Sequence, residues 1–167
     1  MKSIKHYFDP PLPFTTETIK SLEGIVGLYL IFLSQTEIRY PFNSSRLLYI
    51  GMSEAATNSI GKRLNNHYSG KSGNLGLVNY RKIEPLLITH INFQMLKEYW
   101  KHPIQDLESY FILDFVKHYG VYPICNNKSG YNILENDLSI ELDIQWSYFQ
   151  AGSGPTVNTT TGEPTND

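Results

Sequence analysis

The sequence predicts an α+β fold in which a small three-stranded antiparallel sheet is flanked by helices. Three apolar runs rich in β-forming residues lie at about 26–34, 46–52 and 86–93, with turn-forming or polar residues between them. Segments with helical periodicity lie between and after these runs, and the clearest spans 103–119. A chain of 167 residues is long enough for one such domain with an ordinary core.

Composition along the chain predicts four parts. The start is Pro-rich, the middle carries the periodic segments, the following stretch is acidic with some apolar residues, and the end is almost only Gly, Ser, Thr, Pro and Asn. The parts are an N-terminal arm at 1–23, the main domain at 24–131, an acidic C-terminal extension at 132–150 and a disordered tail at 151–167. The arm is expected to be irregular over 1–14, and the acidic extension to form a strand or a short packed segment.

Each predicted helix is bounded by residues that favour helix ends. One helix is expected over 15–22, with Thr15 or Thr16 as its cap, and a second is expected to begin after Thr57 or Asn58 and to end near Tyr68, before Gly70. Two more are expected at 74–80 and at 103–119, the latter with Pro103 at its first position and Gly120 after its last.

Charge is divided unevenly along a chain whose formal net charge is −2. Residues 55–83 contain five basic side chains and no acidic one, whereas residues 129–167 contain six acidic side chains and no basic one. The basic segment predicts contacts with a nucleic-acid backbone. Its residues are Lys62, Arg63, Lys71, Arg81 and Lys82.

The apolar content predicts a cytoplasmic protein without a membrane partner. The longest nearly apolar run, 24–33, is too short to span a bilayer, and no signal-peptide pattern follows Lys2 and Lys5. The single cysteine, Cys125, excludes an internal disulfide framework and is expected to be a small buried residue.

One carboxylate lies on the apolar face of the helix at 103–119. Glu108 falls within the stripe, four residues after Ile104 and four before Ile112. An unpaired carboxylate in such a place would cost several kcal/mol, on the order of the penalty for a buried polar group. Glu108 is therefore expected to be neutral, paired with a cation or bound to a metal ion. The stripe comprises Ile104, Leu107, Phe111, Ile112, Phe115 and Tyr119.

Several separated features follow one another in an order that resembles the GIY-YIG nuclease family. They are Gly27-Leu28-Tyr29 on the first strand, Tyr49-Ile50-Gly51 on the second, Arg63 and His67 on the next helix, Glu108 on a later helix and Pro123-x-x-Asn126 in the loop after it. The sequence departs from the family pattern at Leu28, where the family has Ile, and in the longer insert at 34–46 between the two strands.

The resemblance implies metal-dependent hydrolysis of DNA phosphodiesters by a three-stranded sheet flanked by helices. Tyr29 would be the base and Tyr49 its partner or a water-orienting group, with His67 as a second candidate base. A tyrosine acts as a base near neutral pH only if nearby cations favour its phenolate form. In the same reading Arg63 binds the phosphate, Glu108 holds Mg²⁺ or Mn²⁺ and Asn126 is a supporting amide.

Two other functions remain open at this point. A catalytically silent module of the same fold would bind nucleic acid or protein, and a structural domain would have its acidic end docked on the basic segment. Targeting of a nuclease would need a homodimer or a partner, because no DNA-reading motif is visible. The tripeptide Gly70-Lys71-Ser72 is not read as a phosphate-binding loop, because Asn65 occupies the position of the required first glycine.

Overall fold

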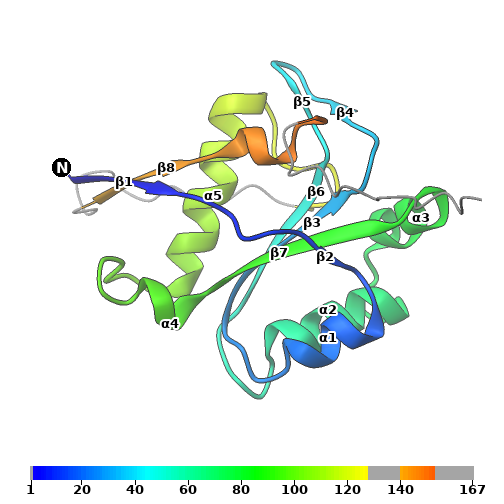
Figure 1. The fold of residues 1–167 in the computed structure, drawn as a ribbon, viewed down its shortest axis with the longest axis horizontal. Helices are drawn as coiled ribbons and strands as arrows, with labels where there is room; N and C mark the ends of the chain where they lie inside the picture. Colours follow the sequence, from blue (N-terminus) through cyan, green and yellow to red (C-terminus); the bar gives the residue numbers. More distant parts are fainter. Residues whose placement is uncertain (1, 128–139, 153–167) are drawn as a thin grey trace, which may run out of the picture.

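A computed structural model describes residues 2–127 and 140–152 as a mixed α/β structure. Its central sheet has four strands in the order β2–β7–β3–β6, and neighbouring strands are antiparallel (Figure 1). The strands are β1 (Lys2–His6), β2 (Leu12–Pro13), β3 (Gly27–Leu33), β4 (Ile38–Arg39), β5 (Ser44–Ser45), β6 (Leu47–Ser53), β7 (Leu86–Asn92) and β8 (Ile140–Ile144). The helices are α1 (Thr16–Ser21), α2 (Ile60–Ser69), α3 (Leu75–Ile83), α4 (Phe93–Leu96) and α5 (Ile104–Tyr119), followed by the 3₁₀ turn η2 (Trp146–Phe149).

The three predicted strands are confirmed as β3, β6 and β7. The central strand β3 is buried along its whole length because both faces of the sheet are covered. This explains why its sequence is continuously apolar rather than alternating. The two-residue strand β2 adds a fourth strand beside β7 that the sequence did not predict.

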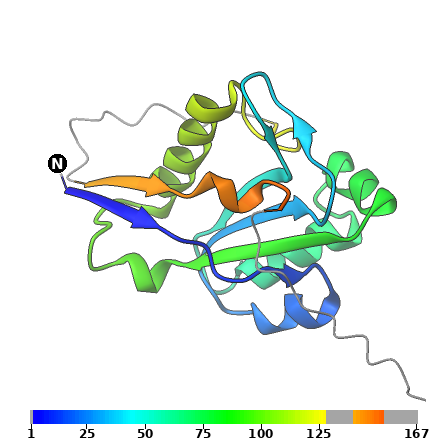
Figure 2. The same ribbon diagram turned by 45° about the horizontal axis from the view of Figure 1, so that its top comes forward.

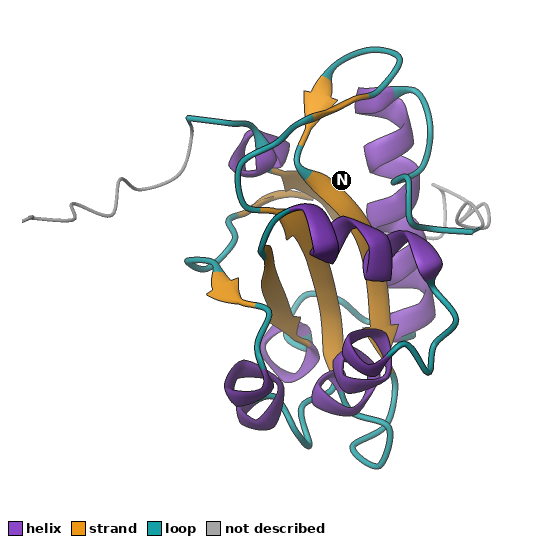
Figure 3. Cartoon of the chain, turned by 90° about the vertical axis from the view of Figure 1, so that its right-hand side faces the viewer, coloured by secondary structure: helices purple, strands orange, loops and turns teal. Residues whose placement is uncertain are grey.

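Alternate side chains of β3 enter two different apolar clusters. Leu28, Leu30 and Phe32 pack on the face covered by α5 and β8. Tyr29 and Ile31 pack on the opposite face, which α1, α2 and α3 cover. Figures 1 and 2 show α1 and α2 on one side of the sheet and α5 on the other, and Figure 3 shows the helices surrounding the strands.

Most helix-end predictions are confirmed. The Thr15 side chain accepts the N–H of Thr18 at the start of α1. Gly70 and Gly120 end α2 and α5 in the left-handed conformation, with φ of 81° and 92°. The cap of α2 was predicted wrongly, since the side chain of Ser59 makes the capping hydrogen bond instead of Thr57 or Asn58. Pro103 is likewise the residue before the first turn of α5 and not its first helical residue. The whole predicted apolar stripe of α5 is buried.

None of the helices in the described ranges combines the length and apolar character needed to cross a membrane.

The N-terminal arm is not irregular throughout. Strand β1 pairs in parallel with β8, and Lys2 lies opposite Ile140. The partner strand is more than a hundred residues away in the sequence, so no local pattern indicated it. The predicted packed segment in the acidic extension is confirmed over 140–149, while the predictions for 132–139 and for 153–167 of the tail lie outside the described residues.

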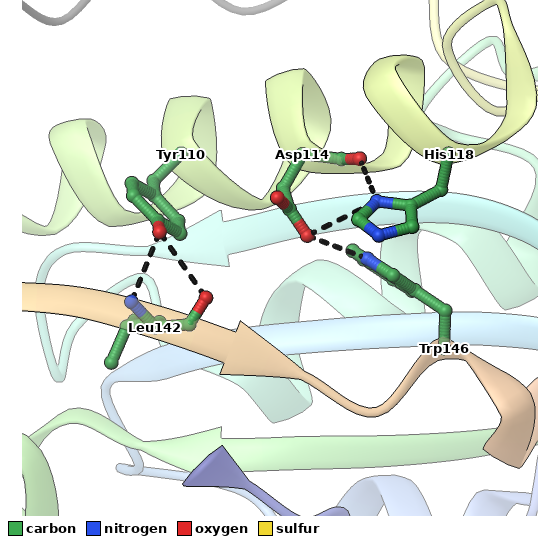
Figure 4. Close-up of polar contacts among 5 residues, drawn as sticks. All are labelled: Tyr110, Asp114, His118, Leu142 and Trp146. Atoms are coloured by element: carbon green, nitrogen blue, oxygen red, sulfur yellow. Dashed lines mark hydrogen bonds and ion pairs between the residues drawn. The ribbon is translucent and has the colours of Figure 1, made fainter. Parts of the chain in front are cut away.

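Hydrogen bonds fix the C-terminal segment on α5 (Figure 4). The Tyr110 hydroxyl donates to the Leu142 carbonyl at 3.2 Å and accepts the Leu142 N–H at 3.0 Å. The indole N–H of Trp146 donates to the Asp114 carboxylate at 2.7 Å. The alternative in which the acidic end docks on the basic residues 55–83 is therefore wrong for 140–149, which pack on α5 and on the face of the sheet that α5 covers.

The longer insert at 34–46 is tied to the same segment by Arg46. Its guanidinium donates to the carbonyls of Ser34 at 3.2 Å, Tyr148 at 3.1 Å and Phe149 at 3.3 Å. It also lies 5.3 Å from the ring centroid of Phe32. One cation thus joins the end of β3 to η2.

Candidate functional site

The hairpin of β3 and β6 brings the two predicted tyrosines together. Tyr29 lies opposite Gly51 and Tyr49 opposite Ile31, so the tyrosines are diagonal neighbours on one face of the sheet. Their ring centroids are 6.0 Å apart. A Cβ at position 51 would come 2.5 Å from Cζ of Tyr29 and 2.6 Å from Cε1 of Tyr49, so only glycine leaves room for both rings.

Helix α2 adds the predicted arginine and histidine to this pair. Arg63 and His67 are one turn apart and face the tyrosines. The Nε–H of Arg63 donates to the Tyr29 hydroxyl at 3.4 Å. Nε2 of His67 lies 3.1 Å from the same hydroxyl, and the His67 ring centroid is 5.0 Å from that of Tyr49.

Glu108 comes from α5, which covers the face of the sheet opposite to the face that α2 covers. It lies on α5, which packs against β6. Its side chain is half-buried. Its negative charge acts on both Tyr49 and Arg63, where it contributes to raising their pKa values. The carboxylate of Glu108 on α5 is therefore near enough to Tyr49 on β6 and to Arg63 on α2 to act on both electrostatically.

The predicted amide, Asn126, supports the strand that carries Tyr49. Its side chain accepts the N–H of Ile50 at 3.0 Å and donates to the Ile50 carbonyl at 2.9 Å. The backbone N–H of Cys125 donates to the Leu48 carbonyl at 2.9 Å. The loop after α5 thus continues the hydrogen bonding of the sheet beyond β6 and fixes the backbone on both sides of Tyr49.

The electrostatics of the tyrosines oppose the expectation of a phenolate base. Burial raises the pKa of the Tyr29 hydroxyl well above its ordinary value, Tyr49 adds to the rise, and Arg63 offsets only part of it. Burial also raises the pKa of Tyr49, against the opposing effect of Arg63. Both phenols are therefore protonated at neutral pH, and Tyr29 is fully buried while Tyr49 is half-buried.

His67 carries no charge at neutral pH. Burial, with a smaller contribution from the positive charge of Arg63, lowers the pKa of His67 to about 4. Burial also lowers the pKa of Arg63, but Tyr29, Tyr49 and Glu108 beside it outweigh this effect and raise it. The site thus holds one permanent cation, protonated phenols and a neutral imidazole with an unprotonated nitrogen.

A divalent cation at this site would have one protein carboxylate. The described parts of the chain contain no group of three or more His, Cys, Asp or Glu side chains that can hold a metal ion. Mg²⁺ binds through one or two carboxylates and keeps several of its waters. Glu108, half-buried and near enough to the half-buried Tyr49 to act on its charge, fits such an ion, with water as its remaining ligands.

The five predicted nucleic-acid contacts differ in their surroundings. Lys62, Lys71 and Lys82 are exposed. Lys62 lines a surface hollow of about 470 Å³ between α1 and α2. Arg81 instead stacks on the Tyr68 ring at 4.0 Å and donates to the Tyr68 carbonyl at 2.7 Å, which gives it a role within the fold.

One contact of the site was missed in the sequence. Oγ of Ser72 lies 2.8 Å from Nδ1 of His67. Ser72 belongs to the tripeptide Gly70-Lys71-Ser72, whose resemblance to a phosphate-binding loop gives no indication of a contact with His67. The sequence signal for this contact is the pair Gly70 and Gly73, which indicates a turn that folds the chain back along α2.

Comparisons of the chain with protein-family models, with curated proteins and with solved structures found no match.

Proposed function

We propose that the chain is a metal-dependent endonuclease of the GIY-YIG type that hydrolyses DNA phosphodiester bonds. The observation that carries this proposal is the clustering of Tyr29, Tyr49, Arg63 and His67 from β3, β6 and α2, with the charge of Glu108 on α5 acting on Tyr49 and Arg63. Phosphoryl chemistry is served by an arginine, a carboxylate and a hydroxyl at a partly exposed position.

Each group has a defined task in this proposal. Arg63 binds the phosphate oxygens on which negative charge develops, through its planar set of donors. Tyr49, which is half-buried, orients the attacking water. The proton lost by that water passes by way of Tyr49 and Tyr29 to the neutral His67, while the new P–O bond forms and the P–O bond to the leaving oxygen breaks. The leaving oxygen takes a proton from solvent, and His67 afterwards returns its proton to solvent by the same route.

Glu108 is the proposed ligand of Mg²⁺ or Mn²⁺. Such an ion, when bound, neutralises charge on the phosphate and on the leaving oxygen. Exposed Lys62, Lys71 and Lys82 contribute salt-dependent contacts to the DNA backbone.

Incubating several DNA molecules of unrelated sequence with the protein and Mg²⁺ or Mn²⁺ tests the proposal. The wild-type chain is expected to nick or cut at least one of them, and Arg63→Ala and Glu108→Ala are expected to lose cleavage by about a hundredfold or more. Glu98→Gln, which changes an exposed carboxylate outside the site, serves as the control and keeps full activity.

The raised pKa values of both tyrosines favour a second candidate, a catalytically silent nucleic-acid-binding module of the same fold. Salt-dependent binding of DNA by the wild-type chain, with all substrates left intact under both metals, would support this module over the nuclease.

A further inference from the structure

The turn after α2 places a hydroxyl against the histidine of the site. Gly70 and Gly73 adopt left-handed conformations with φ of 81° and 71°. Between them the N–H of Ser72 donates to the Asn66 carbonyl at 3.1 Å, which folds the chain back along α2. Oγ of Ser72 thereby comes 2.8 Å from Nδ1 of His67.

Asn74 holds this turn in place. Its backbone N–H donates to Oγ of Ser72 at 3.3 Å. Its side chain accepts the N–H of Leu77 at 3.2 Å, which caps α3, and donates to the Cys125 carbonyl at 2.9 Å. The serine that faces His67 is therefore attached both to α3 and to the loop that supports β6.

Both ring nitrogens of His67 have a neighbour, but a neutral ring carries only one proton. His67 is 6% exposed, so its two ring nitrogens depend mainly on these neighbours for hydrogen bonds. The oxygen of Tyr29 accepts a hydrogen bond from Arg63. The proton of this fully buried phenol then has two acceptors in reach, the Tyr49 hydroxyl and Nε2 of His67 at 3.1 Å, and the imidazole nitrogen is the stronger acceptor of the two.

We infer that Ser72 is a positioning residue that accepts the Nδ1 proton of His67 and so leaves Nε2 free to accept the proton of Tyr29. In this arrangement Oγ of Ser72 accepts two hydrogen bonds, from His67 and from Asn74, which matches its two lone pairs. Without Ser72, the Nδ1 proton has no fixed partner and the ring is free to take the other tautomer, in which Nε2 carries the proton.

The consequence for catalysis rests on the proposed function. In the proposed proton route, Tyr29 gives one proton to Nε2 of His67 and receives one from Tyr49, so that the imidazole ends as a cation that still donates from Nδ1 to Ser72. The tautomer with a proton on Nε2 cannot take part. A variant in which about one molecule in ten keeps Nε2 free would lose about tenfold in kcat.

Nitrogen-15 NMR of histidine-labelled protein at pH 7.5 reads the tautomer without any reference to activity. In the wild-type chain we expect the His67 ring to show a protonated Nδ1 and an unprotonated Nε2. Ser72→Ala should move the signals toward the tautomer protonated on Nε2, and Ser72→Thr, which keeps the hydroxyl, should restore the wild-type pattern. A wild-type ring protonated on Nε2, or a Ser72→Ala spectrum identical to that of the wild type, would overturn the inference.

Kinetics separate this role from the proposed function as a whole. Ser72→Ala is expected to lower kcat about tenfold with an unchanged KM, and Ser72→Thr is expected to stay within about twofold of the wild type. Because Ser72 is exposed, both variants are expected to fold. If the wild-type chain cuts no DNA, the proposed nuclease function is refuted. The NMR measurement then still tests whether Ser72 sets the tautomer of His67. Unchanged cleavage by Ser72→Ala refutes that role alone.

Discussion

Acid is expected to destabilise the fold through His67. Burial and the charge of Arg63 lower the pKa of His67 to about 4 in the folded chain, whereas a histidine in an unfolded chain titrates at about 6.5. Between these values the unfolded chain binds a proton that the folded chain does not. The stability that the neutral His67 provides is therefore complete above pH 6.5 and is lost as the pH falls toward 4. From pH 7.5 to pH 4.5 this linkage removes about 2.5 kcal/mol of the free energy of unfolding.

Urea unfolding at the two pH values, followed by circular dichroism, measures this loss. Other groups titrate equally in the wild type and in His67→Gln, so the difference between the two proteins isolates the histidine. The wild type should lose about 2.5 kcal/mol more than His67→Gln, while His118→Gln, a change at an exposed histidine, should follow the wild type within about 0.5 kcal/mol. Equal losses of unfolding free energy in the wild type and in His67→Gln would refute the buried environment that lowers the pKa of His67.

Three substitutions test the packing and hydrogen bonding that hold the site. Gly51→Ala places a methyl group against the ring of Tyr29 and should cost about 1–3 kcal/mol of unfolding free energy in urea titrations, with loss of cleavage. Arg46→Met leaves the carbonyls of Ser34 and Tyr148 without their guanidinium donor, while Phe149 keeps the backbone N–H of residue 46, and the change should lower stability by about 2 kcal/mol with little change in DNA binding. Asn126→Ala removes two hydrogen bonds to Ile50 and should cost about 1–2 kcal/mol, with a fall in kcat because β6 is loosened beside the site. A Gly51→Ala variant with wild-type activity and stability would contradict the close packing of the Tyr29 and Tyr49 rings against position 51.

The sequence predicted those parts of the fold whose signals are local. Continuous apolar runs identified β3, β6 and β7, and glycines marked the ends of α2 and α5. The pairing of β1 with β8 was missed, because each strand is short and its partner lies at the opposite end of the chain. Parallel pairing over such a separation depends on the apolar surface of α5, which both segments help to cover.

The predicted site residues come together, but their chemistry could not be read from spacing. The order of Tyr29, Tyr49, Arg63, His67 and Glu108 indicated which side chains converge. Burial decided their protonation, since it raises the pKa of the tyrosines and lowers that of the histidine, and burial is set by the packing of α1 and α2 on the sheet. The proton acceptor in the proposal accordingly moves from a phenolate to His67.

The most direct test of the nuclease proposal is the cleavage rate of a pool of random-sequence DNA duplexes under Mg²⁺ or Mn²⁺. Wild type, Glu108→Gln and the control Glu98→Gln would be compared at equal concentration after their folded state has been verified. The proposal predicts metal-dependent cleavage by the wild type and the control, and a loss of at least about a hundredfold in Glu108→Gln. Cleavage by Glu108→Gln at the wild-type rate, or no cleavage by the wild type with either metal, would contradict it.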